Sequence, residues 1–123
     1  MRYALALDLK DDPALIAEYD RYHERIWPEI ERSIQESGIT NMEIYRVGNR
    51  LFMLMETDET FSFERKAAAD AANPKVEEWE ALMWQYQQAL PMAERGESTA
   101  PAGTPERDRP GEKWVLMKKI FAL

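Results

Sequence analysis

One histidine, His23, stands between two aromatic residues at a spacing that suits acid–base chemistry. Tyr19 lies four residues before it and Trp27 four residues after it, so a single helix would place all three side chains on one face. Histidine is the side chain whose unperturbed pKa allows it to give and take protons near neutral pH. This arrangement predicts a small acid–base site for a polar, uncharged substrate.

The same three residues also fit purely structural roles. A histidine on a helix is often held by a neighbouring carboxylate, and Asp20, Glu24 and Glu29 are available here. Aromatic rings at helical spacing mostly belong to a hydrophobic core. From composition and spacing alone, the sequence predicts a globular α+β domain with one suggestive histidine.

Composition narrows the classes of partner and of chemistry. The formal charge of −7 argues against nucleic acid and against anionic membranes, which both attract basic proteins. The sequence has no cysteine, which excludes disulfides, thiolate nucleophiles and zinc–sulfur sites, and one histidine cannot form a multi-histidine metal site within one chain. No apolar run approaches the length of a membrane span, and no secretory segment is visible. We therefore expect a cytoplasmic protein without nucleic-acid or membrane partners.

Apolar periodicity predicts the elements that must position these residues. Strands are predicted at residues 3–9, 41–47, 51–57 and 114–123, with a hairpin turn at residues 48–49. Helices are predicted from residue 13 to a C-terminal cap at Gly38, with a kink at Pro28, and over residues 61–72 and 74–90. Residues 92–113, rich in proline, glycine and charge, are predicted to form a long mobile surface loop.

The predicted helix that starts at Pro74 carries two tryptophans. Trp79 and Trp84 lie five residues apart, which is about 140° around a helix, so they cannot both face one core. One of them is therefore expected to be exposed or to meet a ligand or a second subunit.

The order of these elements predicts the fold class. A β-α-β-β-α(α)-β order is that of the ferredoxin-like split βαβ arrangement, an α+β fold with an antiparallel sheet. We expect one domain over residues 1–123. Helices would cover one face of the sheet, so the other face must be covered by a partner sheet or left as a groove.

The segment around His23 resembles the signature of the L-rhamnose mutarotase family. The matching pattern is Tyr-x-x-x-His-x-x-Ile-Trp-Pro-Glu over residues 19–29, and the residues around Gly38, Ile44 and Trp79 agree with it. The resemblance implies a dimeric ferredoxin-like α/β barrel that interconverts the α and β anomers of a 6-deoxy sugar. It also implies that no metal or organic cofactor is needed, that His23 is the proton donor, and that Tyr19 and Trp79 contact the sugar.

Two departures from the family pattern bear on the choice of sugar. Rhamnose-specific members carry a second tyrosine where this chain has Met42, and a second tryptophan where it has Glu80. Because these positions help to contact the sugar, we expect altered specificity. The pattern looks more like the branch that acts on L-fucose, so L-fucose is preferred over L-rhamnose as the predicted substrate, with Met42, Trp79 and Glu80 as binding residues.

Several alternatives remain open at this stage. Glu80, Glu29 or a water molecule could be the partner of His23 in proton transfer. A dimeric ferredoxin-like monooxygenase or haem-degrading protein would instead use the lone histidine as an iron ligand. A non-catalytic dimerisation or sensory module would use His23 for neither purpose, and its replacement would leave function unchanged.

Overall fold

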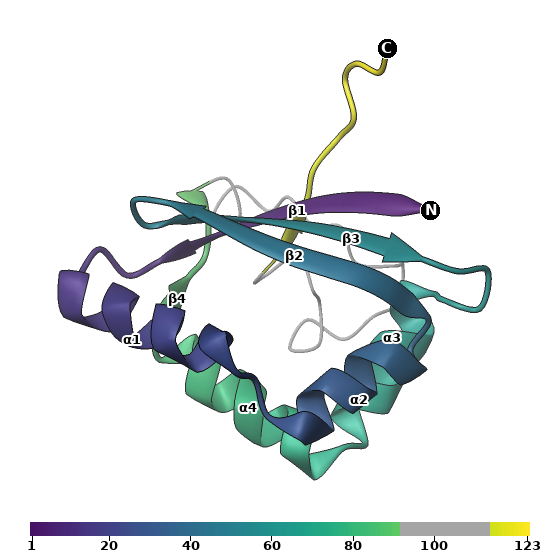
Figure 1. Cartoon of the computed structure of the whole chain (residues 1–123), viewed down its shortest axis with the longest axis horizontal. Helices are drawn as coiled ribbons and strands as arrows, with labels where there is room; N and C mark the ends of the chain where they lie inside the picture. The colour runs from purple at the N-terminus through teal and green to yellow at the C-terminus, as the bar shows by residue number, and fades with distance from the viewer. Residues whose placement is uncertain (92–113) are drawn as a thin grey trace.

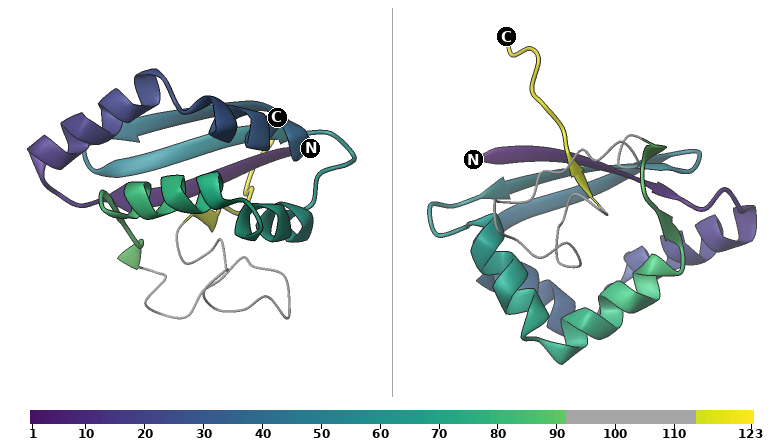
Figure 2. Two further views of the ribbon diagram at one scale, coloured as in Figure 1. Left: turned by 90° about the horizontal axis from the view of Figure 1, so that it is seen from below. Right: turned by 180° about the vertical axis from the view of Figure 1, so that it is seen from behind.

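The structure, a computed structural model, describes residues 1–91 and 114–123. Within these ranges it has five strands: β1 (Arg2–Leu9), β2 (Ile39–Val47), β3 (Arg50–Thr57), β4 (Gln87–Gln88) and β5 (Val115–Leu116). The same ranges hold four helices: α1 (Pro13–Glu24), α2 (Pro28–Glu36), α3 (Phe63–Ala71) and α4 (Pro74–Trp84). The helices lie against one face of the sheet in two rows, α1 with α2 and α4 with α3 (Figures 1 and 2). The loop predicted at residues 92–113 lies outside the described residues.

The sheet is open and antiparallel, with strand order β2-β3-β1-β4 and with β5 also paired to β1. Strands β1 and β2 therefore run in the same direction with β3 between them, which is the split βαβ arrangement of ferredoxin-like domains. The predicted α+β class with an antiparallel sheet is confirmed. The large side chains of β1, Leu5, Leu7 and Leu9, are buried on the face that the helices cover.

The predicted boundaries of two elements are wrong, and both elements lie along the edge of β1 that faces away from β3. Helix α4 ends at Trp84 rather than near Leu90, and the chain then forms β4. There Gln87 and Gln88 pair with Leu9 and Asp8 of β1, and the Lys10 amide donates to the Tyr86 carbonyl at 2.8 Å. The reason is that an unpaired strand edge needs hydrogen-bond partners, and this need overrides the local helical pattern.

The predicted C-terminal strand is also much shorter than expected. Only Val115 and Leu116 pair with β1, along the same edge that β4 covers further on. The Met117 amide still donates to the Ala4 carbonyl of β1 at 2.7 Å, and residues 118–123 then leave the sheet on the side away from the helices (Figure 1). They carry three of the large exposed apolar side chains: Ile120, Phe121 and Leu123.

Proline divides the first helical segment into two separate helices. A kink was predicted at Pro28, but α1 ends at Glu24, and Trp27 has the extended backbone (φ −61°, ψ 138°) that a following proline favours. Trp27 is therefore not on the α1 face that carries Tyr19 and His23, contrary to the prediction. The predicted cap at Gly38 is confirmed, because this residue follows α2 with a positive φ of 97°.

Candidate active site

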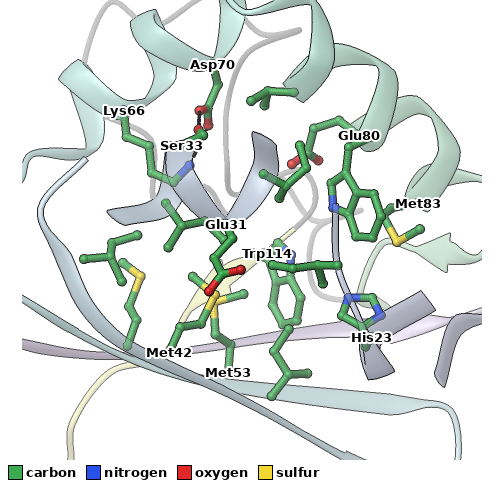
Figure 3. Close-up of a pocket in the computed structure, with 18 of the residues that line it drawn as sticks. His23, Glu31, Ser33, Met42, Met53, Lys66, Asp70, Glu80, Met83 and Trp114 are labelled. Carbon is green, nitrogen blue, oxygen red and sulfur yellow. Dashed lines mark hydrogen bonds and ion pairs between the residues drawn. The ribbon is translucent and has the colours of Figure 1, made fainter. Parts of the chain in front are cut away.

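A cleft of about 1150 Å³ lies between the helix-covered face of the sheet and the helices. All five residues predicted to act on substrate line it: Tyr19, His23, Met42, Trp79 and Glu80. Figure 3 shows His23 and Met83 at one end of the cleft, Lys66 and Asp70 at the other, and Met42 and Met53 along the sheet between them. Residues that are far apart in the sequence thus meet around a single space.

Helix α1 presents Tyr19 and His23 to this cleft one turn apart, as their spacing predicts. The Tyr19 ring lies 4.3 Å from the His23 ring, measured between centroids. The His23 Nδ1 atom is 2.9 Å from the Tyr19 carbonyl oxygen. Because a carbonyl can only accept, Nδ1 must carry the hydrogen, and this leaves Nε2 as the nitrogen that can exchange a proton.

The surroundings of His23 disfavour its charged form. Burial lowers the pKa of His23 below its ordinary value of 6.5, and it outweighs the opposing effects of the Tyr19 carbonyl and the Asp20 carboxylate. Among residues 1–91 and 114–123, no carboxylate forms a hydrogen bond with His23, and its ring is held by the backbone of its own helix. At neutral pH His23 is therefore mostly an uncharged imidazole with a lone pair on Nε2.

This lowered pKa has a measurable effect on stability. Between 6.5 and the lowered pKa, the unfolded chain binds a proton at His23 more readily than the folded chain does. The contribution of His23 to the free energy of unfolding is therefore fully present above pH 6.5 and is lost as the pH falls through this interval. We expect urea unfolding of the wild type and of His23→Asn to show it, because the stability of the wild type relative to the variant should decrease from pH 7.5 to pH 5.5. An unchanged difference would contradict the burial of His23.

Helix α4 supplies the second aromatic wall. Trp79 is 6% exposed and packs edge-on against His23, with 5.8 Å between ring centroids, and against Trp27 at 5.1 Å. Trp84 is 40% exposed, which confirms that the two tryptophans of α4 do not share the core. The Trp79 ring of α4 therefore contacts the imidazole in addition to the Tyr19 ring of α1, and a change at Trp79 is expected to disturb His23.

Tyr19 itself is almost completely buried. It is 2% exposed, and its hydroxyl accepts a hydrogen bond from the Gln87 amide at 3.3 Å. Burial raises the pKa of Tyr19 to about 12, so the phenol stays protonated at neutral pH and well above it. A lesser cause of this shift is the Glu80 carboxylate, which places that negative charge in the vicinity of the same site. Tyr19 can therefore hold His23 and donate a hydrogen bond, but it cannot act as a base.

Two residues that line the cleft were not predicted from the sequence as site residues. Gln87 lines it from β4 and Trp114 from the start of β5. A signal for Gln87 did exist, because residues 79, 83 and 87 would share one helical face and a glutamine there interrupts an apolar stripe. Nothing in the sequence predicts that Trp114 lines the same cleft as His23. A further polar group, in which Lys66 pairs with Asp70 at 2.7 Å, lies at the far end.

Within residues 1–91 and 114–123, no three His, Cys, Asp or Glu side chains are grouped so that they could hold a metal ion. The helices of this part of the chain are also too short or too polar to cross a membrane. The cleft offers one titratable imidazole, carboxylate and amide side chains, and aromatic and methionine surfaces.

Known proteins with a similar sequence include sugar mutarotases. Residues 2–123 match the model of the L-rhamnose mutarotase family. An L-fucose mutarotase from Xanthomonas campestris pv. campestris is 44% identical over 99% of this chain and 87% of its own length. An L-rhamnose mutarotase from Phocaeicola vulgatus is 31% identical over 69% of this chain and 74% of its own length.

The fold also has a counterpart among solved structures. An L-rhamnose mutarotase from Formosa agariphila aligns with a TM-score of 0.65 at 18% identity, over 100% of this chain and 98% of that one. Sequence, fold and cleft together define an enzyme of the isomerase class, a sugar mutarotase. The chain belongs to the L-rhamnose mutarotase family.

Proposed function

We propose that this enzyme interconverts the α and β anomers of a free 6-deoxyhexose, with L-fucose preferred over L-rhamnose. The 44% identity with an L-fucose mutarotase supports the preference. The cleft supports it as well, because Met42 and Glu80 both line it. By resemblance to the family, these two positions contact the sugar, and rhamnose-specific members carry a tyrosine and a tryptophan there. A methionine adapts its shape to an apolar group such as the deoxy methyl, and a carboxylate accepts hydrogen bonds from hydroxyls.

We assign the proton transfer to Nε2 of His23. In ring opening, the imidazolium gives its proton to the ring oxygen, the bond between that oxygen and the anomeric carbon breaks, and a second group takes the proton of the anomeric hydroxyl. The open aldehyde then turns and closes from its other face, and each group reverses its role. The lowered pKa makes the imidazolium a stronger acid than free imidazolium, and it makes the neutral form readily available for the return step.

Of the partners left open by the sequence, we propose Glu80 as this second group. It lines the same cleft as His23, and its charge acts on Tyr19, whose ring packs on His23. Glu29 is exposed at the start of α2 and is not among the residues that line the cleft. The aromatic walls formed by Trp79 and Tyr19 would pack on the apolar faces of the sugar.

Anomer exchange measured by NMR saturation transfer tests this proposal. We expect a substoichiometric amount of the enzyme to accelerate exchange between α- and β-L-fucose, and to accelerate exchange of L-rhamnose less. D-Glucose, which carries a hydroxyl on C6, is the control sugar, and boiled enzyme is the control for general acid–base effects of protein. An enzyme that accelerates neither deoxy sugar would refute the proposal, and a titration with haem that changes its Soret band would favour the haem-binding alternative.

We also propose that the enzyme is a homodimer in which the uncovered sheet faces of two copies meet to form an α/β barrel. By strand alternation, this face carries apolar side chains in facing positions: Ala4 with Leu54, and Ala6 with Phe52. Ion pairs Arg2–Glu56 and Asp8–Arg50 border them at opposite ends. Sedimentation equilibrium would show a single dimeric species.

The cytoplasm is the proposed compartment, since a chain without cysteine gains nothing from an oxidising one.

A further inference from the structure

Gln87 is a buried polar side chain that the proposed chemistry does not yet use. It is 5% exposed, it lines the cleft, and its backbone is fixed by pairing with Leu9 of β1. Its amide nitrogen donates to the Tyr19 hydroxyl at 3.3 Å. Its amide oxygen is buried and has no hydrogen-bond partner among residues 1–91 and 114–123. One end of this amide is thus held in place while the other remains unsatisfied.

An unsatisfied buried acceptor destabilises a fold, because it has lost its bonds to water without replacement. Turning the amide by half a turn would exchange its two ends and still leave one of them unpaired. An apolar side chain of similar length, such as methionine, would avoid this cost and fill the same volume. The position of the amide next to Tyr19 and within the same cleft as His23 points to a ligand as the missing partner.

We propose that Gln87 is a substrate-binding residue whose amide oxygen accepts a hydrogen bond from a ring hydroxyl of the sugar. The inference rests on the proposed function and adds a specific contact to it. Sugar hydroxyls are donors that a buried carbonyl can pair with, and a fixed contact of this kind both binds a ligand and orients it. Because Tyr19 links Gln87 to the ring of His23, one hydroxyl held by Gln87 would fix where the sugar ring stands relative to Nε2.

Two variants of Gln87 separate this role from a purely structural one. Gln87→Met keeps the length and removes the amide, whereas Gln87→Asn keeps the amide and withdraws it by one methylene. We expect both to raise the KM for L-fucose, and its dissociation constant by calorimetry, about tenfold or more, since each leaves a sugar hydroxyl unpaired. Gln88→Met is the matched control: this neighbour in β4 is exposed, and its replacement should leave both constants unchanged.

Deoxy analogues of L-fucose identify the hydroxyl and add a test that a structural role cannot pass. On the analogue that lacks the bonded hydroxyl, the wild type and Gln87→Met should have the same KM, while they should differ on the other analogues. Melting temperatures of the variants report on folding independently. Wild-type constants in both folded variants would overturn the inference. If the wild type neither binds L-fucose nor accelerates its anomer exchange, the proposed function itself fails, and the two failures are thereby distinguished.

Discussion

His23→Asn is expected to reduce the acceleration of anomer exchange by about 10²–10⁴-fold, the usual contribution of one positioned acid–base group. Asparagine can still donate an N–H group to the Tyr19 carbonyl, as Nδ1 of His23 does at 2.9 Å. It has no counterpart of Nε2 that could take up and release a proton near neutral pH. The rate should therefore fall while the binding of L-fucose and the melting temperature change little. Saturation-transfer NMR at saturating sugar measures the effect.

Two carboxylate variants accompany this experiment, one that tests the second proton-transfer group and one that serves as the control. Glu80→Gln removes the proposed second proton-transfer group and should also lower the rate. Glu29→Gln changes an exposed carboxylate close to His23 in the sequence but outside the cleft lining, so its rate should equal that of the wild type. Retention of most of the rate in His23→Asn would contradict its assigned role. A rate loss in Glu29→Gln alone would move the second group from Glu80 to Glu29.

Trp79→Ala should have the largest effect on stability, a loss of about 3–5 kcal/mol in the free energy of unfolding. Trp79 is 6% exposed and belongs to the main core cluster, where its ring meets the rings of Tyr22, His23 and Trp27. Removing it leaves a cavity between α4 and the two helices of the other row. Since domains of this size are stable by only about 5–15 kcal/mol, the variant should unfold at much lower urea concentration.

Trp84→Ala is the control from the same helix. Trp84 is 40% exposed, so less buried apolar surface is lost on its replacement, and the loss in free energy of unfolding should be smaller than that of Trp79→Ala. Urea unfolding followed by far-UV circular dichroism compares the two variants without depending on tryptophan fluorescence. Equal losses in the two variants would contradict the placement of Trp79 in the core and Trp84 at the surface.

Local sequence signals were sufficient to predict most of the elements. Asp12 and Asn73, each followed by proline, cap α1 and α4 with side-chain oxygens that accept from the following amides. Alternation located β1, β2 and β3, and Gly48-Asn49 marked the hairpin. The spacing of Tyr19 and His23 correctly predicted that they would be neighbours on one helix face. These features depend on interactions between residues only a few positions apart.

The features that were missed depend on contacts between distant residues. Tyr86 and Leu90 continue the helical spacing of α4, yet Tyr86 accepts from Lys10, which is 76 residues earlier in the chain, because β1 needs a partner there. The same pairing brings Gln87 to Tyr19. No local pattern could predict this edge, or that Trp114 and His23 would line the same cleft. The roles of Met42 and Glu80 were likewise inferred from a family resemblance and not from their spacing.

The edge of β1 has a consequence for how such enzymes diverge. Strand β4 is paired at Asp8 and Leu9 and strand β5 at Leu5 and Ala6, so the chain is anchored independently before residue 91 and after residue 114. Insertions and deletions between these two anchors need not shift either of them, and doubling the length of a connecting segment costs only about 0.6 kcal/mol in closure entropy. Homologues can therefore lengthen or shorten this segment over evolutionary time while the residues around His23 keep their geometry.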